Sequence, residues 1–271
     1  MTHSTVKLGL IGGGVMGEAL LSRLIEQQIY QPTEVTVSEP QLQRQDTLAQ
    51  QYGVNVTGQN SDAATATEVL LLAIKPQIFQ TVAGELSTAK IPTETLIISI
   101  LAGVPLSQLE AAFPHHPIVR VMPNTPALVG AGMSAISAGE RVEPHHLQQA
   151  KQILNAVGEV VEVPERLMDA VTGLSGSGPG YVAVMIEALA DGGVAAGLPR
   201  AIASQLALQT VLGTAQLLQQ SHMHPAELKD RVTSPGGTTI AGIAKLEQAG
   251  LRSALIQAVI AASQRSQELG S

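Results

Sequence analysis

A glycine-rich segment near the N-terminus has the residue types and spacing that suit the binding of a phosphate group. Residues 12–17 read Gly-Gly-Gly-Val-Met-Gly and fit the pattern G-x-G-x-x-G. In this pattern Gly12 permits a tight turn, Gly14 lets the backbone approach a pyrophosphate, and Gly17 lets a helix pack closely on a strand. The apolar run before the segment and the amphipathic run after it are typical of a strand and a helix. We therefore predict a dinucleotide site, for which a plain glycine turn is the alternative.

The nature of the dinucleotide depends on residues at the end of the second predicted strand. Ser38 and Glu39 stand about where an acidic residue holds the adenosine ribose 2′-hydroxyl in NAD-binding proteins. The Glu39 carboxylate would repel a 2′-phosphate and favours NADH, whereas Ser38 and Arg44 are able to hold that phosphate and favour NADPH. Arg44 is equally consistent with a solvated helix residue. The sequence predicts NADPH or NADH as the cofactor and leaves the preference open.

Two further segments follow predicted strands, at the edge of the sheet where ligands bind in open α/β folds. Residues 73–76 read Ala-Ile-Lys-Pro, and Lys75 is interpreted either as a coenzyme contact or as a surface lysine. Residues 123–126 read Pro-Asn-Thr-Pro, in which Asn124 is a candidate contact for the nicotinamide. The alternative for this second segment is a rigid connector whose polar groups are satisfied internally.

Two segments in the second half combine glycine with small hydroxyl residues just before predicted helices. Residues 173–180 read Gly-Leu-Ser-Gly-Ser-Gly-Pro-Gly, and residues 234–239 read Ser-Pro-Gly-Gly-Thr-Thr. The free N–H groups of a helix N-terminus form a site for an anion. Gly236 and Gly237 are able to orient consecutive N–H groups inward. Ordinary helix caps are the alternative, since Ser and Thr cap helices well.

Short β-branched runs alternate with amphipathic stretches in the first part of the chain. Strands are predicted at residues 7–11, 34–38, 55–57, 69–74, 96–100 and 118–122, with extensions near 132–137 and 160–163. Helices are predicted at residues 15–28 and 41–52, and, after a change of character near residue 165, at 181–196, 199–220 and 251–268. Such alternation is typical of a parallel sheet with helices on both faces. We predict an α/β protein with an N-terminal Rossmann dinucleotide-binding domain over residues 1–166 and an all-helical C-terminal domain over residues 167–271.

The composition excludes several classes of function. The net charge is −7 and only 2% of the residues are aromatic, so neither a basic face nor stacking side chains for nucleic acid are expected. The absence of cysteine excludes thiolate chemistry and suits a cytoplasmic protein. The longest apolar runs, such as residues 69–74, are too short to cross a membrane, and no targeting segment is recognised. No metal site is expected, because the pairs His115–His116 and His222–His224 have no carboxylate at useful spacing.

Together, these segments resemble the pyrroline-5-carboxylate reductase family. The resemblance spans nearly the whole chain and is carried by the glycine loop, by residues 73–76, 169–179, 190–194 and 197–200 and, most specifically, by residues 234–239. It implies an N-terminal Rossmann domain and a helical C-terminal domain that forms a dimer, with dimers often assembled into decamers. It also implies the last step of proline biosynthesis, in which NAD(P)H reduces pyrroline-5-carboxylate to proline.

The resemblance also indicates which residues form the site. With Gly17, Ser38 and Asn124 added from the motifs above, the expected cofactor-lining residues are Ile11, Gly12, Gly13, Gly14, Val15, Met16, Glu39, Asn60, Ala73, Ile74, Lys75, Pro76, Ile100, Leu101 and Ala102. The expected substrate-binding residues are Glu165, Arg231, Ser234, Gly236, Gly237, Thr238 and Thr239. The chain departs from the family's pattern at Glu39, where smaller or phosphate-friendly residues are common, and at Gly180, which replaces the usual alanine.

In the expected reaction a hydride passes from C4 of the nicotinamide to C5 of the imine. The backbone N–H groups of Gly236, Gly237 and Thr238 are expected to hold the substrate carboxylate. Thr239 is the expected catalytic residue, because its hydroxyl is the best candidate to hydrogen-bond the ring nitrogen and orient the ring. It need not be a strong acid, since the imine can arrive protonated.

Other functions of the same architecture are a related imine reductase, a β-hydroxyacid-type dehydrogenase and a non-catalytic dinucleotide sensor. The dehydrogenases need a lysine at the start of the helical domain to move an alcohol proton, and residues 172–181 contain none. A serine hydrolase is disfavoured, because Ser177 stands where G-x-S-x-G requires glycine. A sensor would not require an intact segment at residues 234–239.

Overall fold

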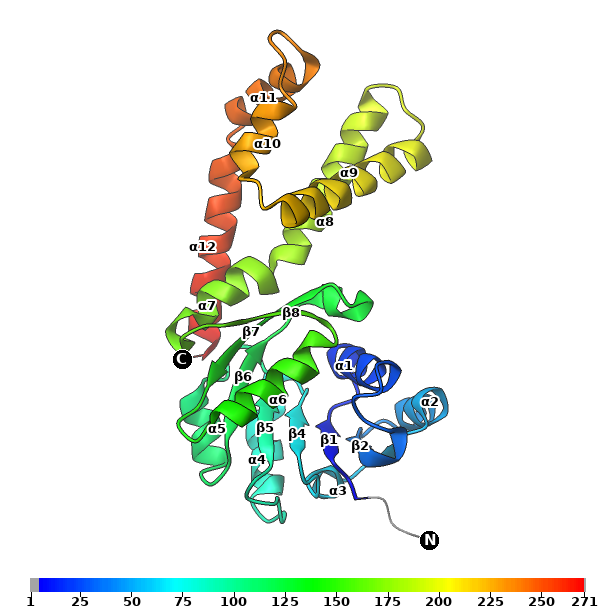
Figure 1. Ribbon diagram of the computed structural model, residues 1–271, viewed down its shortest axis with the longest axis vertical. Helices are drawn as coiled ribbons and strands as arrows, with labels where there is room; N and C mark the ends of the chain where they lie inside the picture. The colour runs from blue at the N-terminus through cyan, green and yellow to red at the C-terminus, as the bar shows by residue number, and fades with distance from the viewer. Residues whose placement is uncertain (1–4, 271) are drawn as a thin grey trace. The chain divides into compact units, whose positions relative to one another are not determined.

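The structure is a computed structural model that describes residues 5–270. Of these, the residues up to Gly176 and those from Ala262 onward form one compact unit, and Ser177–Ala261 form a second. The first unit contains the sheet and the second is made of helices (Figure 1). The change of unit comes later than the predicted boundary at residue 166, and the end of the chain returns to the first unit.

The first unit is built on an eight-stranded sheet in the order β3-β2-β1-β4-β5-β6-β7-β8. The strands are β1 Leu8–Ile11, β2 Val35–Ser38, β3 Asn55–Thr57, β4 Val69–Leu72, β5 Leu96–Ser99, β6 Ile118–Met122, β7 Gly132–Ala138 and β8 Gly158–Glu162. The first six strands are parallel and follow the order 3-2-1-4-5-6 that is typical of dinucleotide-binding folds. The predicted Rossmann architecture is therefore confirmed.

The direction of one strand differs from the predicted parallel sheet. β7 pairs with β6 in the antiparallel direction, with Val121 opposite Ile136. The reason is the short connection between them, whose only helix is the 3₁₀ turn η3, Thr125–Val129. A parallel partner needs a crossover of a dozen or more residues, which this connection lacks. β8 returns parallel to β7 after the longer helix α6, Pro144–Asn155.

Helices cover both faces of the sheet (Figure 1). The helices of this unit are α1 Val15–Glu26, α2 Leu42–Tyr52, α3 Asn60–Ala63, α4 Phe79–Leu86, α5 Leu106–Ala112, α6 and α7 Met168–Val171, followed by the π-helical turn η5 Thr172–Gly176. Alternate residues of β4 enter different cores, Val69 and Leu71 beneath α1 and α6, and Leu70 and Leu72 beneath α3, α4 and α5. A strand buried on both faces is apolar at every position, which explains the continuous apolar runs in the sequence.

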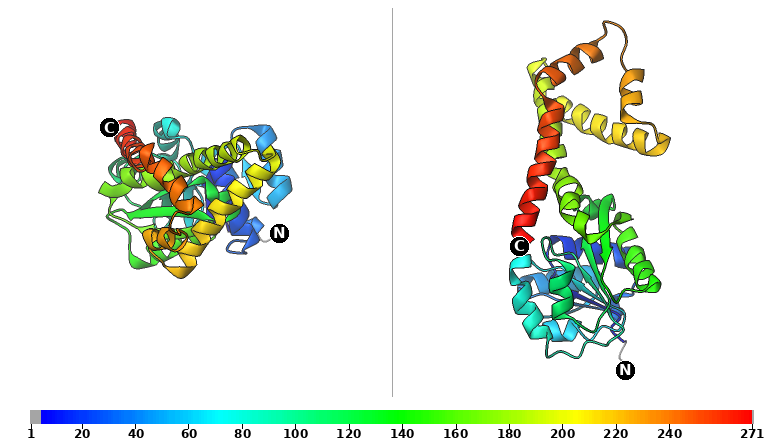
Figure 2. Two further views of the ribbon diagram at one scale, coloured as in Figure 1. Left: turned by 90° about the horizontal axis from the view of Figure 1, so that it is seen from above. Right: turned by 90° about the vertical axis from the view of Figure 1, so that its left-hand side faces the viewer.

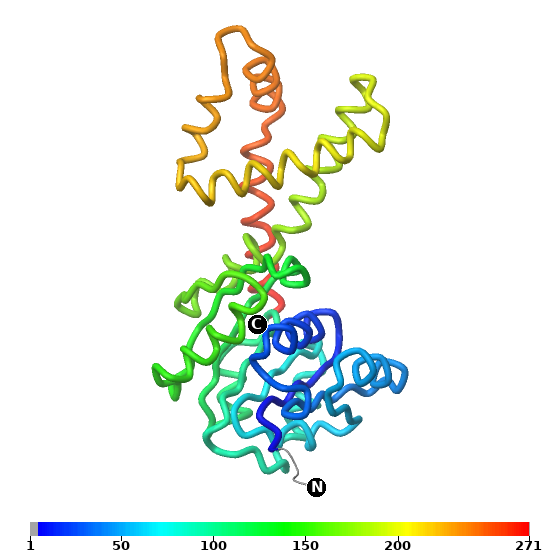
Figure 3. Tube along the Cα trace, turned by 45° about the vertical axis from the view of Figure 1, so that its right-hand side comes forward, coloured from blue at the N-terminus to red at the C-terminus, as the bar shows by residue number. Residues whose placement is uncertain are grey.

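The second unit consists of helices joined by short loops. They are α8 Gly178–Ala195, α9 Arg200–Ser221, α10 Pro225–Arg231, α11 Thr238–Gln248 and the first part of α12 Leu251–Gly270. The three helices predicted from periodicity are therefore confirmed, with ends shifted by a few residues. Figure 3 follows the chain through this unit from α8 to α12.

The helices of the second unit bury few of their apolar side chains within the chain. On α9 only Ala203 and Ala207 are buried, while Leu206 and Leu208 are more than half exposed. Among the described residues, α9 is also the one helix that is long and apolar enough to cross a membrane, with 22 residues and a mean hydropathy of 1.2. An exposed apolar surface of this kind marks a site of contact with another protein or with a membrane.

The last turns of α12 pack on the first unit (Figure 2). The Ser266 hydroxyl, which is buried, donates to a carboxylate oxygen of Asp169 at 2.6 Å. At Gly270 a side chain would lie 2.8 Å from the Gly103 carbonyl oxygen. The end of the helix thus lies against the loop that follows β5.

Candidate functional site

The carboxyl ends of the central strands bring the predicted cofactor segments together. Ala73 donates its N–H to the Ile11 carbonyl at 2.8 Å, and Ile100 donates to the Leu72 carbonyl at 3.1 Å. The residues after β1, β4 and β5 therefore lie side by side. This edge lies where the strand order reverses, between β1 and β4, and ligands of open α/β sheets bind in the crevice at such a point.

The glycine loop after β1 has a shape that side chains would prevent. Gly12 has φ +101°, and a Cβ there would lie 2.6 Å from the Ala73 carbonyl oxygen. A Cβ at Gly17 would overlap the Gly12 carbonyl, so this glycine allows α1 to pack against the strand end. Gly14 differs, because a Cβ there would meet no atom within 4 Å. Open space beside Gly14 is what the predicted approach of a pyrophosphate to this backbone requires.

The N-terminus of α1 faces this open space with its donors free. Gly14 is the N-cap and provides no side-chain cap. Among the residues that the structure describes, none accepts a hydrogen bond from the N–H groups of Val15, Met16 or Gly17. Free N–H groups and the positive end of the helix dipole suit a diphosphate. The residues present therefore fit a dinucleotide cofactor.

The residues around the end of β2 form a connected polar network. Buried Glu39 accepts hydrogen bonds from the N–H of Gly13 at 3.1 Å and from the N–H of Gln41 at 3.0 Å. Arg44 donates through Nε to the Gly13 carbonyl at 2.8 Å and forms an ion pair with Glu18. Arg44 is therefore a partner of the glycine loop, not a freely solvated helix residue.

A second branch of this network joins two predicted cofactor residues. The Ser38 hydroxyl hydrogen-bonds to Oδ1 of Asn60 at 2.7 Å, and Nδ2 of Asn60 donates to Glu85 at 2.6 Å. Ser38 is almost fully buried. Both polar side chains are thus bound within the protein.

Sequence reasoning missed two members of this network, Glu18 and Tyr52. The Tyr52 hydroxyl donates to Oε1 of Glu18 at 2.9 Å, and Glu18 lies in the first turn of α1. Burial and the neighbouring Glu18 carboxylate raise the pKa of Tyr52 to about 12. An acidic residue just after the glycine motif was the available signal, but its partners on α2 lie too far along the chain to be recognised from spacing.

Both polar atoms of the Asn124 side chain form hydrogen bonds within the first unit. Its Nδ2 donates to the Ser175 carbonyl at 3.1 Å, and its Oδ1 accepts from the N–H of Met133 at 2.8 Å. These bonds tie the loop after β6 to β7 and to η5. The geometry favours the rigid connector over the nicotinamide contact.

Lys75 lies at the carboxyl edge of the sheet, three residues after β4 ends at Leu72. It is the N-cap of the short 3₁₀ turn η2, Pro76–Ile78, and is exposed. No carboxylate of the described residues forms an ion pair with its ammonium group. An uncompensated cation beside the glycine loop suits a diphosphate.

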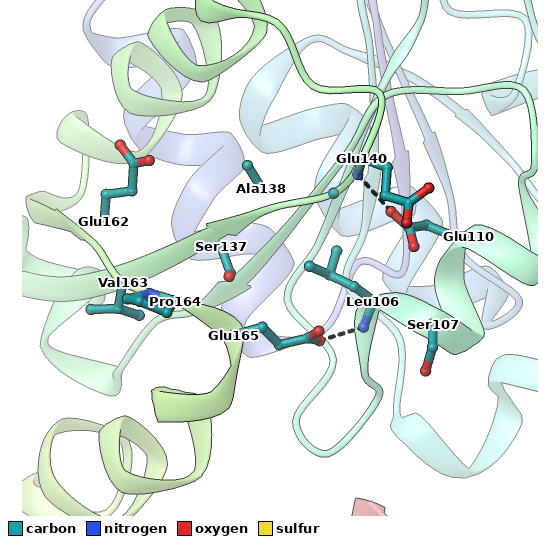
Figure 4. Close-up of a pocket in the computed structure, with 11 residues that line it drawn as sticks. Leu106, Ser107, Glu110, Ser137, Ala138, Glu140, Glu162, Val163, Pro164 and Glu165 are labelled. Carbon is teal, nitrogen blue, oxygen red and sulfur yellow. Dashed lines mark hydrogen bonds between the residues drawn. The ribbon is translucent and has the colours of Figure 1, made fainter.

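Glu165, expected at the substrate, is held by the first unit. Its Oε1 accepts from the Leu106 N–H at 2.5 Å (Figure 4). The same oxygen pairs with Arg120 at 3.0 Å. Arg120 is largely buried on β6, so this pair fixes the start of α5 and the segment after β8 to the sheet. The carboxylate is a structural partner in this geometry.

The pocket beside Glu165 has a volume of about 640 Å³ and several acidic residues in its lining. Glu110 accepts from the N–H of Glu140 at 2.8 Å, and Glu162 pairs with Lys151 at 3.1 Å. Figure 4 shows Glu110 directed at the backbone of Glu140 and Glu165 at that of Leu106, while Glu162 lies apart from both. Because each is already bound or points away, the pocket does not form a common cation site.

In the second unit, residues 234–239 form a turn that leads into α11. Gly236 has φ +68°, a conformation that favours glycine. The Gly237 N–H donates to the Ser234 carbonyl at 3.0 Å and closes the turn. The turn itself uses the N–H of Gly237, which was expected to hold the substrate carboxylate, and the contact of this donor with a carboxylate stays a prediction.

Other donors of this turn are free. Gly237 is the N-cap of α11 and provides no side-chain cap. Within residues 5–270, no group accepts from the N–H of Gly236, Thr238 or Thr239. The Thr239 side chain is exposed, whereas Arg231 pairs with Glu227 at 2.7 Å. This helix start thus resembles that of α1 in having several unpaired N–H groups and no side-chain cap.

Comparison with protein families divides the chain in a similar way. Residues 165–269 match the family described as pyrroline-5-carboxylate reductase dimerisation. Residues 7–103 match the family described as NADP oxidoreductase, coenzyme F420-dependent.

Individual relatives match over almost the full length. A pyrroline-5-carboxylate reductase of Synechocystis is 61% identical over 98% of this chain and 99% of its own. The structure of a pyrroline-5-carboxylate reductase from Coxiella burnetii has a TM-score of 0.90, 36% identity and coverage of 98% and 99% of the two chains. The structure of the Plasmodium falciparum pyrroline carboxylate reductase with NADP bound has a TM-score of 0.88, 32% identity and coverage of 99% of both chains.

Proposed function

The chain belongs to the pyrroline-5-carboxylate reductase family, and from this premise we propose which of its residues hold and orient the substrate. Its activity is the NAD(P)H-dependent reduction of 1-pyrroline-5-carboxylate to L-proline. When bound, the cofactor supplies the hydride that reduces the C=N bond. The chain's own residues bind, orient and polarise the two partners.

The diphosphate of the cofactor is held by the start of α1. The observations that support this are the free N–H groups of Val15 and Met16 and the open space at Gly14. Lys75, without an ion-pair partner among the described residues, adds a positive charge at the same edge of the sheet.

The substrate carboxylate is held by the start of α11. The free N–H groups of Gly236, Thr238 and Thr239 are the single observation that carries this assignment. Charge-assisted hydrogen bonds from backbone N–H groups are strong and need no reorganisation when the anion arrives. Gly237 contributes by closing the turn that fixes Gly236 at positive φ.

Thr239 orients the ring of the substrate. Its hydroxyl lies in the first turn of α11 and is exposed, so it is available to hydrogen-bond the imine nitrogen. A hydroxyl is sufficient, because the protonated imine is already a strong electrophile and the proton stays on nitrogen in the product amine. Glu165 and Arg231 support their own units through Arg120 and Glu227, and direct contact with the substrate is not required of them.

The chain self-associates through its dimerisation domain. Dimers are proposed to assemble further into decamers, and the protein to act in the cytoplasm without a membrane. The exposed leucines of α9 support a dimer, since a second copy would cover them as effectively as lipid. The absence of cysteine suits the reducing cytoplasm.

The test of Thr239 is to replace it by alanine and by serine. Thr239→Ala is expected to lower kcat by about tenfold or more while the Kd for NADH stays unchanged, because only the orienting hydrogen bond is lost. Thr239→Ser keeps the hydroxyl and should retain most of the activity. Both are measured by the loss of nicotinamide absorbance with pyrroline-5-carboxylate. Wild-type turnover in Thr239→Ala would remove this residue from the mechanism.

A further inference from the structure

We propose that Glu39 makes this chain prefer NADH to NADPH. The inference rests on the proposed function, since it concerns the adenosine end of the same cofactor site. It deepens that function by assigning the group that discriminates between the two coenzymes. These differ only in the 2′-substituent of the adenosine ribose, a hydroxyl in NADH and a phosphate in NADPH.

The position of Glu39 is fixed by the sheet. The residue follows β2 directly, and its N–H donates to the Thr57 carbonyl at 2.9 Å. The preceding residue, Ser38, accepts from the N–H of Gly12 at 2.9 Å, which places the glycine loop beside the end of β2. This is the place at which a dinucleotide-binding fold receives the adenosine ribose.

The carboxylate of Glu39 is held in one orientation. The residue is only 7% exposed, and its two oxygens accept separately from the N–H groups of Gly13 and Gln41. A carboxylate offers about four acceptor positions, so about two stay available for ribose hydroxyls. A 2′-phosphate has no hydrogen to donate when ionised and would bring like charges together.

The groups that could offset this repulsion are already bound. Ser38 and Asn60 hydrogen-bond to each other, and Asn60 donates its amide to Glu85. Arg44 directs Nε to the Gly13 carbonyl and pairs with Glu18. A 2′-phosphate would have to break these contacts before gaining any of its own.

The charge around the ribose position is also unfavourable for a phosphate. Among the described residues of the network, Arg44 is the one cation, and it pairs with Glu18. Glu39 and Glu85 add two further carboxylates to the same network. A low-dielectric position strengthens repulsion between like charges. The geometry therefore points to a site that accepts a 2′-hydroxyl and rejects a 2′-phosphate.

The test compares adenosine 5′-phosphate with adenosine 2′,5′-bisphosphate. Calorimetric Kd values are measured without substrate for the wild type, Glu39→Gln and Asp46→Asn. Glu39→Gln removes the charge but keeps an acceptor for the Gly13 N–H. Asp46→Asn removes an equal charge from an exposed position on α2 and serves as the control. Thermal unfolding checks that all three proteins are folded.

The wild type is expected to bind the bisphosphate at least about tenfold more weakly than the monophosphate. Glu39→Gln should remove most of that difference, and Asp46→Asn should leave it unchanged. The kcat/KM ratio of NADH to NADPH should follow the same order. A wild type that binds the bisphosphate more tightly, or a Glu39→Gln variant with an unchanged Kd ratio, would overturn the proposal.

These measurements distinguish a failure of the proposed reductase activity from a failure of the coenzyme preference. If neither coenzyme supported reduction of pyrroline-5-carboxylate but the Kd difference depended on Glu39, the proposed function would fail and the inference would stand. If reduction were faster with NADPH, the inference would fail and the function would stand.

Discussion

At the scale of single residues, two glycines of one loop have opposite surroundings. A side chain at Gly17 would overlap the Gly12 carbonyl, whereas a side chain at Gly14 would enter open space. Gly17 is therefore required by packing, and Gly14 is proposed to be required by the cofactor. The motif alone cannot separate these roles, because both positions read simply as glycine.

Alanine substitutions should separate stability from binding. Gly14→Ala is expected to leave the free energy of unfolding nearly unchanged and to raise the Kd for NADH by about tenfold or more, because the methyl group occupies the open space proposed for the pyrophosphate. Gly17→Ala should lower the free energy of unfolding by about 1–3 kcal/mol through overpacking. Denaturant titration and nicotinamide fluorescence measure the two effects. Normal coenzyme binding by Gly14→Ala would contradict this proposal.

The motifs of the site could be predicted from the sequence, but the hydrogen-bond partners of its polar residues could not. The glycine loop and the 73–76 segment were recognisable because their spacing relative to strand ends is local. The partners of Asn124 and Glu165 were not, since Ser175 and Arg120 are 51 and 45 residues away along the chain. Only the folded chain shows that these two side chains are occupied by structural bonds.

At the scale of elements, period-two and helical patterns predicted most strands and long helices. The patterns did not predict the direction of β7, which depends on the length of the loop before it. They also passed over short helices such as α3, whose four residues carry too little periodicity. The helix starts were the most informative elements for locating the site. At the starts of α1 and α11, several backbone N–H groups have no acceptor among the described residues.

The start of α6 depends on a neutral histidine. Nδ1 of His146 accepts from the Glu143 N–H at 3.1 Å, and the Glu143 side chain caps the helix in return. Burial, with a smaller contribution from neighbouring His145, lowers the pKa of His146 below its usual value, although Glu143 and Glu94 act in the opposite direction. Protonation would remove the acceptor and break this cap.

The stability of the fold should therefore fall in mild acid. Below pH about 6.5 the unfolded chain binds a proton at His146 that the folded chain resists, so the free energy of unfolding decreases as the pH falls toward the lowered pKa. Above that pH both states are neutral and the contribution is complete. His146→Gln keeps an acceptor for the cap and does not titrate. At pH 8 the variant and the wild type should have the same denaturant midpoint of unfolding. At pH 5 the midpoint of the variant should be higher than that of the wild type. The same pH dependence of the midpoint in both proteins would contradict this role.

At the scale of the whole molecule, one helix belongs to both units. The first part of α12 lies in the helical unit, and its end packs on the first unit near Asp169 and Gly103. The sequence predicted an all-helical second domain, but few of the side chains of the helical unit are buried within one chain. We propose that a second copy of the chain covers these side chains, and a single sequence does not display such a contact.

Self-association should depend on the apolar side chains of α9. Leu208 and Leu212 are 56% and 47% exposed and lie one turn apart. The double substitution Leu208→Glu and Leu212→Glu is expected to shift the protein to a smaller species, because two charges would be buried at the interface. Gln219→Glu near the end of the helix adds a charge without removing a leucine and is the control. Light scattering measures the mass, and an unchanged mass of the double variant would exclude this surface.

The most direct test of the account removes one backbone donor at the proposed carboxylate site. Thr238 is the first residue of α11, where proline fits a helix, and the preceding Gly237 has an extended backbone that suits it. Thr238→Pro deletes the N–H and the side chain, while Thr238→Ala deletes the side chain alone. The measurement is kcat/KM with NADH for pyrroline-5-carboxylate and for 1-pyrroline, which lacks the carboxylate.

We expect the wild type and Thr238→Ala to prefer pyrroline-5-carboxylate strongly. Thr238→Pro should lose about tenfold or more of that preference, because a hydrogen bond to a charged group contributes about 1.5–3 kcal/mol. Its activity on 1-pyrroline should match that of Thr238→Ala. An equal loss on both compounds, or a preference equal to that of Thr238→Ala, would contradict the binding of the carboxylate by the start of α11.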